Sequence, residues 1–162
     1  ARHARQDSAF DRVHRQQDLP ALLGDADYVV ITAPLTPDTD GLFDRDRLNG
    51  MKKGAYLVNT ARGRIINTQD LVAVMNSGHL AGYAGDVWYP QPAPSDHPWR
   101  KMPNHAMTPH VSGTSLEAQK RYSDGIRDCM ASFFKGEPID RDYIIVEGGR
   151  VTSPSYSYAY EG

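Results

Sequence analysis

The apolar residues of this 162-residue chain fall into short uninterrupted runs, separated by loops and by helical patterns. Residues 27–32 and 55–59 are β-branched and apolar without polar alternation, which is typical of strands buried on both faces of a parallel sheet. Residues 82–88 begin as a third short buried strand, whose small residues let other groups approach its backbone closely. We therefore expect these stretches to form neighbouring strands.

Helical patterns lie between the expected strands. Residues 18–24 predict a short helix with Asp18 as its N-cap, and residues 45–51 predict another. A further helix follows Asn67 or Thr68, and its apolar face comprises Leu71, Val72, Met75 and Leu80. Because strand, loop and helix recur at the spacing of βαβ units, the predicted fold class is α/β with a parallel sheet.

A longer helix is expected from residue 115 to about residue 135, ended by Gly136. Its apolar residues recur at steps of three and four and predict one buried stripe, formed by Ala118, Tyr122, Ile126, Cys129 and Phe133. Residues 139–146 predict a strand or extended segment. The tail, residues 153–160, is rich in tyrosine and serine, and is either a solvated end or a flap laid across a neighbouring groove.

Charge and cysteine content limit the classes of binding partner and the cellular compartment. Eighteen lysines and arginines stand against 20 aspartates and glutamates, for a net charge of −2, so no basic field favours nucleic acid or a membrane surface. No apolar run is long enough to span a bilayer, and the first residues form no apolar signal core. The single cysteine, Cys129, excludes an internal disulfide and suits a reducing compartment, so we expect a cytoplasmic protein. We also expect no metal site.

Polar side chains occur where the expected strands end. Arg62 follows the second strand, Asp86 ends the third, Gln91 lies in a proline-rich loop and His110 follows Thr108-Pro109. Ligands bind at the carboxyl ends of strands in open α/β sheets, and a guanidinium there can clamp a small carboxylate. Since prolines stiffen the loop, we hypothesise that Gln91 and His110 face each other across a site.

These residues lie in recognisable motifs. Residues 59–63, 82–94, 96–99 and 108–114 resemble the motifs of nicotinamide-dependent formate dehydrogenase, within the D-specific 2-hydroxyacid dehydrogenase superfamily. The resemblance extends from the first residues to about Gly149. It implies a Rossmann-like sheet in residues 1–111, as the second part of the dinucleotide-binding domain. Residues 112–162 would then be a C-terminal helix and tail that join the substrate domain.

Family members are much longer, and the glycine-rich fingerprint G-x-G-x-x-G does not occur in this sequence. We therefore expect the chain to be the C-terminal part of an enzyme, inactive alone. Its expected partners are the remainder of the same enzyme chain, a second copy in a homodimer, and formate.

The resemblance also implies roles for individual residues. Arg62 binds the formate carboxylate, and His110, held by Gln91, completes the anion site beside the nicotinamide. Asp86, Ser112 and Gly113 hold the nicotinamide carboxamide. The other residues implied to bind the cofactor are Ala1, Arg2, Pro34, Leu35, Thr36, Pro37, Asp38, Thr60, His110 and Ser155.

The cofactor is predicted from the first residues. Formate dehydrogenases that use NAD typically carry an aspartate just before an Arg-His pair, where it repels a 2′-phosphate. Here Ala1 stands at that position before Arg2 and His3, and Thr36 replaces a histidine common in the family. Because Arg2 can pair with a phosphate, we expect NADP in preference to NAD.

Two other functions are compatible with parts of the pattern. The first is a glyoxylate-type 2-hydroxyacid dehydrogenase. A 2-hydroxy acid loses a proton as well as a hydride and calls for a histidine supported by a carboxylate, which Gln91 is not. The second is a non-catalytic dinucleotide-binding module, which would have no need of Arg62 and His110 as an anion clamp.

Overall fold

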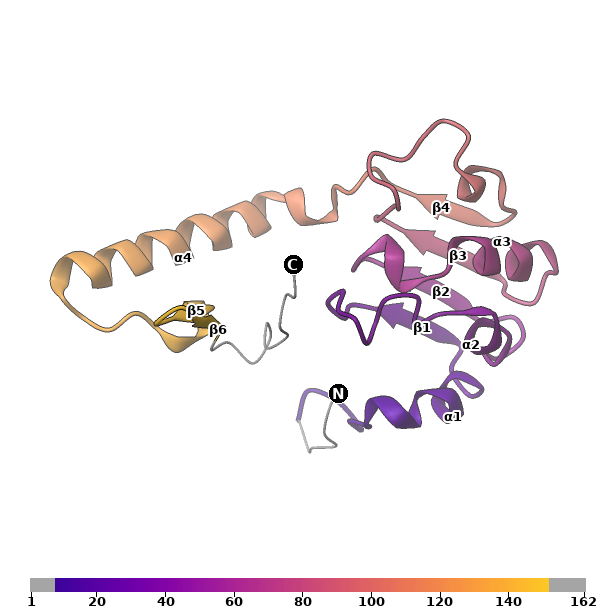
Figure 1. The fold of residues 1–162 in the computed structure, drawn as a ribbon, viewed down its shortest axis with the longest axis horizontal. Coiled ribbons are helices and arrows are strands. Elements are labelled where there is room, and N and C mark those ends of the chain that lie inside the picture. Colours follow the sequence, from indigo (N-terminus) through magenta and orange to yellow (C-terminus); the bar gives the residue numbers. More distant parts are fainter. Residues whose placement is uncertain (1–7, 152–162) are drawn as a thin grey trace. The chain divides into compact units, whose positions relative to one another are not determined.

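The computed structural model describes residues 8–151, and the chain divides into two compact units, one ending at His110 and the other starting at Val111. The first unit is built on a sheet of four parallel strands in the order β1-β2-β3-β4 (Figure 1). The strands are β1 (Tyr28–Ile31), β2 (Tyr56–Asn59), β3 (Gly82–Gly85) and β4 (His105–Met107). The predicted parallel α/β sheet is confirmed.

Strand β4 was not expected from the sequence. It has only three residues and contains no β-branched side chain, so it lacks the pattern that marks β1 and β2. Its position depends on pairing with β3, in the register Tyr83 to His105 and Gly85 to Met107. Tertiary pairing, rather than local propensity, makes this segment a strand.

Short helices precede β1 and connect the strands. They are η1 (Gln16–Asp18), α1 (Leu19–Leu23), α2 (Arg45–Asn49), η2 (Gly63–Ile65), α3 (Thr68–Asn76) and η3 (Pro98–Lys101). The Asn67 side chain caps α3, because its Oδ1 accepts hydrogen bonds from the backbone N–H groups of Gln69 and Asp70 at 3.1 and 3.2 Å. Asp18 occupies the N-cap position of α1 as predicted. Its carboxylate does not cap the helix, because it accepts a hydrogen bond from the backbone N–H of Arg15 and not from the first turn of α1.

The core of the first unit lies on one face of the sheet. Leu57 of β2 and Tyr83 of β3 point to this face, and α2, α3 and η3 contribute Leu48, Leu71, Met75 and Trp99; each of these side chains is at most 2% exposed. Helices α2 and α3 lie side by side there (Figure 1). The indole of Trp99 also donates a hydrogen bond to the backbone oxygen of Thr68, at 3.1 Å. Loop η3 is thereby fixed to the start of α3.

The opposite face of the sheet is open within the described residues. Tyr28 and Val30 of β1 are 69% and 57% exposed, and Tyr28 stacks on the ring of Tyr56 at 5.3 Å between centroids. The expectation that β1 is buried on both faces is therefore wrong for this unit. The apolar run was interpreted correctly as a strand, but the helices between the strands in the described residues cover one face only.

The second unit contains η4 (Ser112–Thr114), α4 (Leu116–Lys135), η5 (Arg141–Tyr143) and a hairpin of β5 (Val146–Glu147) and β6 (Arg150–Val151). The long helix is confirmed, with Ser115 as its N-cap and Gly136 ending it in the left-handed conformation, φ 68°. The single strand or extended segment predicted over 139–146 is wrong, because η5 and the start of the hairpin occupy it.

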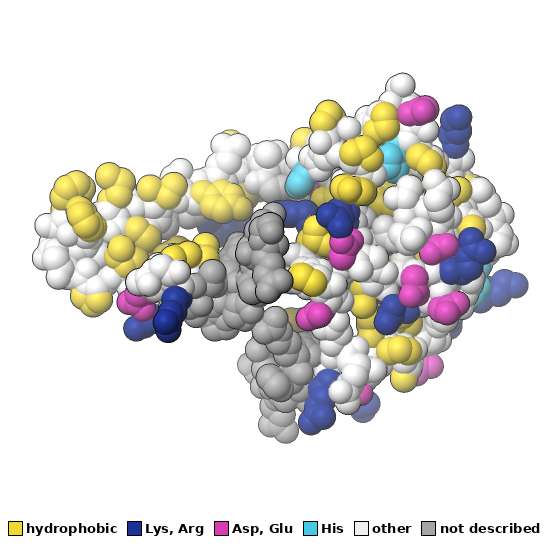
Figure 2. Space-filling view, viewed as in Figure 1, with side chains coloured by type: hydrophobic (Ala, Val, Ile, Leu, Met, Phe, Trp, Pro, Cys, Tyr) yellow, Lys and Arg dark blue, Asp and Glu magenta, His cyan; other side chains and the backbone are white. Residues whose placement is uncertain are grey.

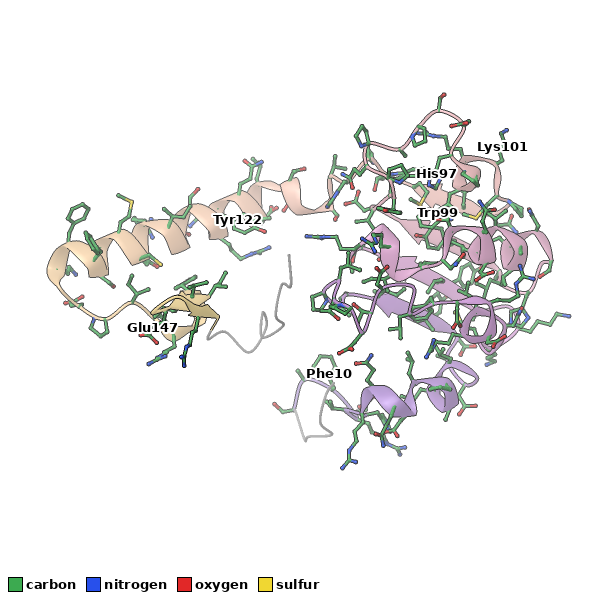
Figure 3. All side chains as sticks on the ribbon, in the orientation of Figure 1. Phe10, His97, Trp99, Lys101, Tyr122 and Glu147 are labelled. Carbon is green, nitrogen blue, oxygen red and sulfur yellow. The ribbon has the colours of Figure 1, made fainter. Side chains whose placement is uncertain are left out.

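The predicted buried stripe of α4 is apolar but not buried. Tyr122, Ile126 and Phe133 are between 62% and 71% exposed, and Cys129 is partly exposed. Hydrophobic side chains gather along this helix in Figure 2, and Tyr122 projects from it in Figure 3. Of its residues only Gly125 is buried, against the ring of Tyr143. Periodicity identified the apolar face but not what covers it. Across residues 8–151, every helix is too short or too polar to cross a bilayer.

The hydroxyl of Tyr83 generates a stability prediction. It is buried and has no hydrogen-bond partner among residues 8–151. Burial raises the pKa of Tyr83, and this effect is larger than the opposing effect of the neighbouring Asn59 side chain. Removing an unsatisfied buried hydroxyl removes its desolvation cost. We expect Tyr83→Phe to raise the free energy of unfolding in urea by about 1 kcal/mol. Tyr56→Phe, at an exposed ring, should change nothing.

The same substitution has a pH signature. Above the ordinary tyrosine pKa of about 10, Tyr83 ionises in the unfolded chain but stays protonated when folded, so the free energy of unfolding falls as pH rises. Tyr83→Phe should lose that part of the alkaline destabilisation. A destabilised Phe variant would show that the hydroxyl has a favourable partner.

Candidate active site

The carboxyl ends of the four strands meet at one edge of the sheet. Parallel registers pair Ile31 with Asn59, Asn59 with Gly85 and Gly85 with Met107. Each strand then leaves into a loop that contains predicted site residues (Figure 1). Residues 34–38 follow β1, Thr60 and Arg62 follow β2, Asp86 and Gln91 follow β3, and His110 follows β4.

The loop that holds Arg62 is organised by a buried amide. Asn59, at the end of β2, is fully buried; its Oδ1 accepts from the backbone N–H of Ala61 at 3.0 Å, and its Nδ2 donates to the backbone oxygen of Arg62 at 2.9 Å. The Arg62 side chain is exposed, and its Nη1 donates to the backbone oxygen of Ala61 at 2.7 Å. Since a guanidinium has five N–H donors, further donors remain to bind an anion.

Asp86 supplies a buried carboxylate at the end of β3. It is 3% exposed, and its Oδ1 accepts a hydrogen bond from the Thr108 hydroxyl at 2.5 Å. A buried charge needs such donors to offset its lost hydration. Thr108 also donates its backbone N–H to the oxygen of Gly85, at 2.9 Å. The hydroxyl therefore ties the exits of β3 and β4 together and fixes the carboxylate beside them.

The predicted pairing of Gln91 with His110 is confirmed. Nδ1 of the imidazole lies 2.7 Å from Nε2 and 2.9 Å from Oε1 of the Gln91 amide. The amide can donate to a bare Nδ1 or accept from a protonated one, so the hydrogen bond is available to both the neutral imidazole and the imidazolium. His110 has φ +65°, in the left-handed region that a non-glycine residue rarely adopts. Such backbone strain is common at functional sites.

The proline-rich loop is held by more than its prolines. The Arg100 guanidinium lies over the Trp88 ring, 4.8 Å from its centroid, and donates to the backbone oxygens of Ala93 and Pro94 at 3.2 and 3.0 Å. A cation over an aromatic face is stabilised by the ring quadrupole. The predicted stiffness of the Gln91 loop therefore has a side-chain component that the proline count did not indicate.

The loop after β1 folds around a buried threonine. Thr39 is 7% exposed; its hydroxyl donates to the backbone oxygen of Pro34 at 2.7 Å and accepts from the N–H of Thr36 at 2.8 Å. Thr39 is one of the site-building residues that sequence reasoning missed; Asn59 and Thr108 are the others described above. A signal was available for Asn59, a small polar residue at the end of the apolar strand β2.

Several predicted residues are not brought to this edge by the described first unit. Ser112 and Gly113 lie in η4 of the second unit. Ala1, Arg2 and Ser155 lie outside the described residues. No cluster of three or more histidine, cysteine or acidic side chains that could hold a metal occurs within residues 8–151.

Comparison with known proteins places this geometry in a family. The profile of the D-isomer specific 2-hydroxyacid dehydrogenase, NAD binding domain, matches residues 1–112. The chain belongs to this family. It is 53% identical to the mitochondrial formate dehydrogenase of Solanum tuberosum over 141 residues, which make up 87% of this chain but 37% of that protein. The chain thus spans little more than a third of the length of this relative.

Solved structures give the same picture of this dehydrogenase domain. A Staphylococcus aureus NAD-dependent formate dehydrogenase in complex with NAD is 58% identical, with a TM-score of 0.68, covering 79% of this chain and 39% of that one. A Granulicella formate dehydrogenase is 44% identical, with a TM-score of 0.81, covering 94% and 41%. The Rossmann-like fold expected from the motifs is therefore confirmed.

The bond between Thr108 and Asp86 in this domain can be tested without a cofactor. Thr108→Val removes a donor from a buried carboxylate, so we expect the free energy of unfolding of the chain to fall by about 1.5 to 3 kcal/mol. Thr108→Ser keeps the hydroxyl and should lose less than half of that. Urea unfolding of both variants provides the comparison. Equal losses would assign the effect to the threonine methyl group instead.

Proposed function

We propose that this chain is the nicotinamide-binding and anion-binding part of an NAD(P)-dependent formate dehydrogenase. The observation that carries the proposal is the hydrogen bond between the Gln91 amide and His110 at the carboxyl edge of the sheet. Arg62 leaves the neighbouring strand at the same edge. Identities of 58% and 53% to formate dehydrogenases support the assignment.

An amide partner suits the oxidation of formate. Formate becomes carbon dioxide by losing a hydride alone, so the site has no proton to abstract. Oxidation of a 2-hydroxy acid also releases the hydroxyl proton and needs a histidine base, which a carboxylate would orient and support. Gln91 keeps His110 in place without adding a negative charge beside an anionic substrate.

We assign each side chain one task. Arg62 pairs with the formate carboxylate through its remaining donors, and His110, oriented by Gln91, contacts the same anion. The bound nicotinamide accepts the hydride. Holding two reactants in one geometry can lower a barrier by about 7 to 11 kcal/mol, so we infer that positioning by these residues is the main contribution to catalysis.

The described residues fit a dinucleotide. Asp86 places a buried carboxylate, an acceptor for an amide N–H, at the carboxyl edge where α/β sheets bind such ligands. We propose that Asp86, with Ser112 and Gly113, binds the carboxamide. The loop organised by Thr39, together with Thr60, would line the adenosine and ribose side.

Two apolar surfaces support a larger assembly. The open face of the sheet and the stripe of α4 both expose aromatic side chains, Tyr28 and Tyr122 among them. Apolar faces of this kind are normally covered by protein. We propose that the remainder of an enzyme chain covers them, that residues 112–162 join a substrate domain, that the enzyme is a homodimer, and that these 162 residues are inactive alone.

We further propose a reducing compartment, the cytoplasm, on the strength of the single cysteine. The Solanum tuberosum relative is a mitochondrial enzyme. Free thiols also persist in mitochondria. Fractionation of cells that express the protein would distinguish the two locations.

The function is tested in a chimera, in which the N-terminal part of the Staphylococcus aureus enzyme precedes these 162 residues. We expect formate-dependent reduction of the nicotinamide cofactor and no comparable activity with glyoxylate. Gln91→Glu adds a negative charge beside the anion, so kcat/KM for formate should fall by about tenfold or more at neutral pH, the equivalent of 1.4 kcal/mol. Undiminished turnover by this variant would contradict the role of the amide.

We propose separately that the enzyme prefers NADP to NAD. It is supported by Ala1 in place of the aspartate common in NAD-using relatives, and by Arg2 next to it. Against it, the Staphylococcus aureus relative binds NAD. We expect Ala1→Asp in the chimera to reduce kcat/KM with NADP by about tenfold or more relative to NAD, because a carboxylate repels the 2′-phosphate. A preference for NAD before the substitution would refute the proposal.

A further inference from the structure

The glycine after Arg62 makes an unusually close contact. Gly63 is buried, and a Cβ built on it would lie 2.5 Å from the backbone carbon and 2.6 Å from the backbone oxygen of Trp88, and 2.9 Å from the nitrogen of Tyr89. Only glycine allows two backbone segments to approach in this way. The Arg62 loop therefore rests directly on the backbone of Trp88 and Tyr89, two residues before Gln91.

His97 holds the same backbone through a hydrogen bond. Its Nε2 donates to the backbone oxygen of Tyr89 at 3.0 Å, and its Nδ1 accepts from the N–H of Trp99 at 3.2 Å. The two bonds together require the proton on Nε2. The ring is 2% exposed and packs edge-on against Trp88 and Trp99, each at 5.2 Å between ring centroids. His97 and Trp99 lie close together in Figure 3. His97 is thus a buried histidine that the proposed chemistry leaves unused.

The strand that leads to His110 reaches this point as well. The indole N–H of Trp88 donates to the backbone oxygen of Thr108, at 2.9 Å. We call Trp88 and Tyr89 the junction. Gly63 connects it to the Arg62 loop, the chain itself connects it to Gln91, and Thr108 connects it to His110. The positions of all three groups of the anion site, Arg62, Gln91 and His110, therefore depend on these two residues.

We propose that Gly63 and His97 are positioning residues, which fix the junction and thereby set the separation between the Arg62 guanidinium and the Gln91–His110 pair. The inference rests on the proposed function, because it concerns the binding of formate. A three-atom anion must meet both groups at once, so a displacement of about 1 Å costs far more than it would with a larger carboxylate. The loop after β1 is organised separately by Thr39, so cofactor binding should depend less on the junction.

The experiment compares two glycine substitutions in the chimera. Gly63→Ala forces the loops apart and should raise KM for formate about tenfold or more, equivalent to 1.4 kcal/mol. The dissociation constant for the cofactor, from a fluorescence titration, should stay within about threefold. Gly24→Ala is the matched control, because its Cβ would meet neighbours at 3.7 and 3.9 Å and its φ is −67°. It should change neither constant.

A second pair of variants does not depend on Gly63→Ala folding. In His97→Asn the amide oxygen can still accept from Trp99, but the donor to Tyr89 is lost. In His97→Gln the longer amide can still donate to Tyr89. We expect KM for formate to rise about five- to tenfold in the Asn variant and less in the Gln variant. Amide hydrogen exchange of Tyr89, Gln91 and Ala93, the residues of 89–94 that carry an amide hydrogen, should be faster in the Asn variant.

The outcomes separate the two proposals. If the folded Gly63→Ala and His97→Asn variants leave the KM for formate unchanged, the positioning role is overturned. It is also overturned if the KM for formate and the dissociation constant for the cofactor rise by the same factor. If the unsubstituted chimera has no formate activity, the proposed function fails, and hydrogen exchange remains as the readout. Unchanged exchange of residues 89–94 in both variants would then overturn the inference.

Discussion

The first unit depends on one constraint, the parallel pairing of its four neighbouring strands in the order β1-β2-β3-β4. In a parallel sheet all strands end at one edge, so the loops after Ile31, Asn59, Gly85 and Met107 have to leave from neighbouring points. The buried face, with Leu57 and Tyr83 against α2 and α3, fixes the register, because a slip of one residue would turn these side chains away from the core. Packing far from the edge thereby determines which polar groups meet there.

The strand exits create a second requirement, since backbone groups that leave a sheet lose their ladder partners. Small polar side chains satisfy several of them here. Asn59 bonds the backbone of Ala61 and Arg62, Thr39 bonds that of Pro34 and Thr36, and His97 bonds the Tyr89 oxygen. Each of these three residues is at most 7% exposed. Arg62, Gln91 and His110, which would contact the anion, are exposed, while Asn59, Thr39 and His97, which shape the loops, are buried.

The sequence predicted the elements with strong local signals. Uninterrupted apolar runs gave β1 and β2, Asn67 marked the start of α3, and Gly136 marked the end of α4. Gln91 and His110 could be paired because a stiff loop limits where a side chain can reach. Strand β4 could not be predicted, because its three residues become a strand only through pairing with β3. Burial of Tyr122 and Val30 was predicted wrongly, since periodicity describes a face and not its cover. Gly63 was quoted in a motif, but its close contact depends on a segment 25 residues away in the chain.

The backbone of His110 shows how such a site is maintained. A non-glycine residue at φ +65° is strained by about 1 to 3 kcal/mol, so an isolated loop would relax to another conformation. Here Thr108, two residues earlier, is bonded through its N–H to Gly85, through its hydroxyl to Asp86 and through its oxygen to Trp88. The Gln91 amide holds the ring from the other side. These bonds leave the chain little freedom to relax the torsion, because any relaxation would break hydrogen bonds that are each worth about 0.5 to 3 kcal/mol. The strained torsion at His110 is therefore a consequence of the hydrogen bonds that fix the ends of β3 and β4. It directs the imidazole toward the Gln91 amide at the carboxyl edge of the sheet.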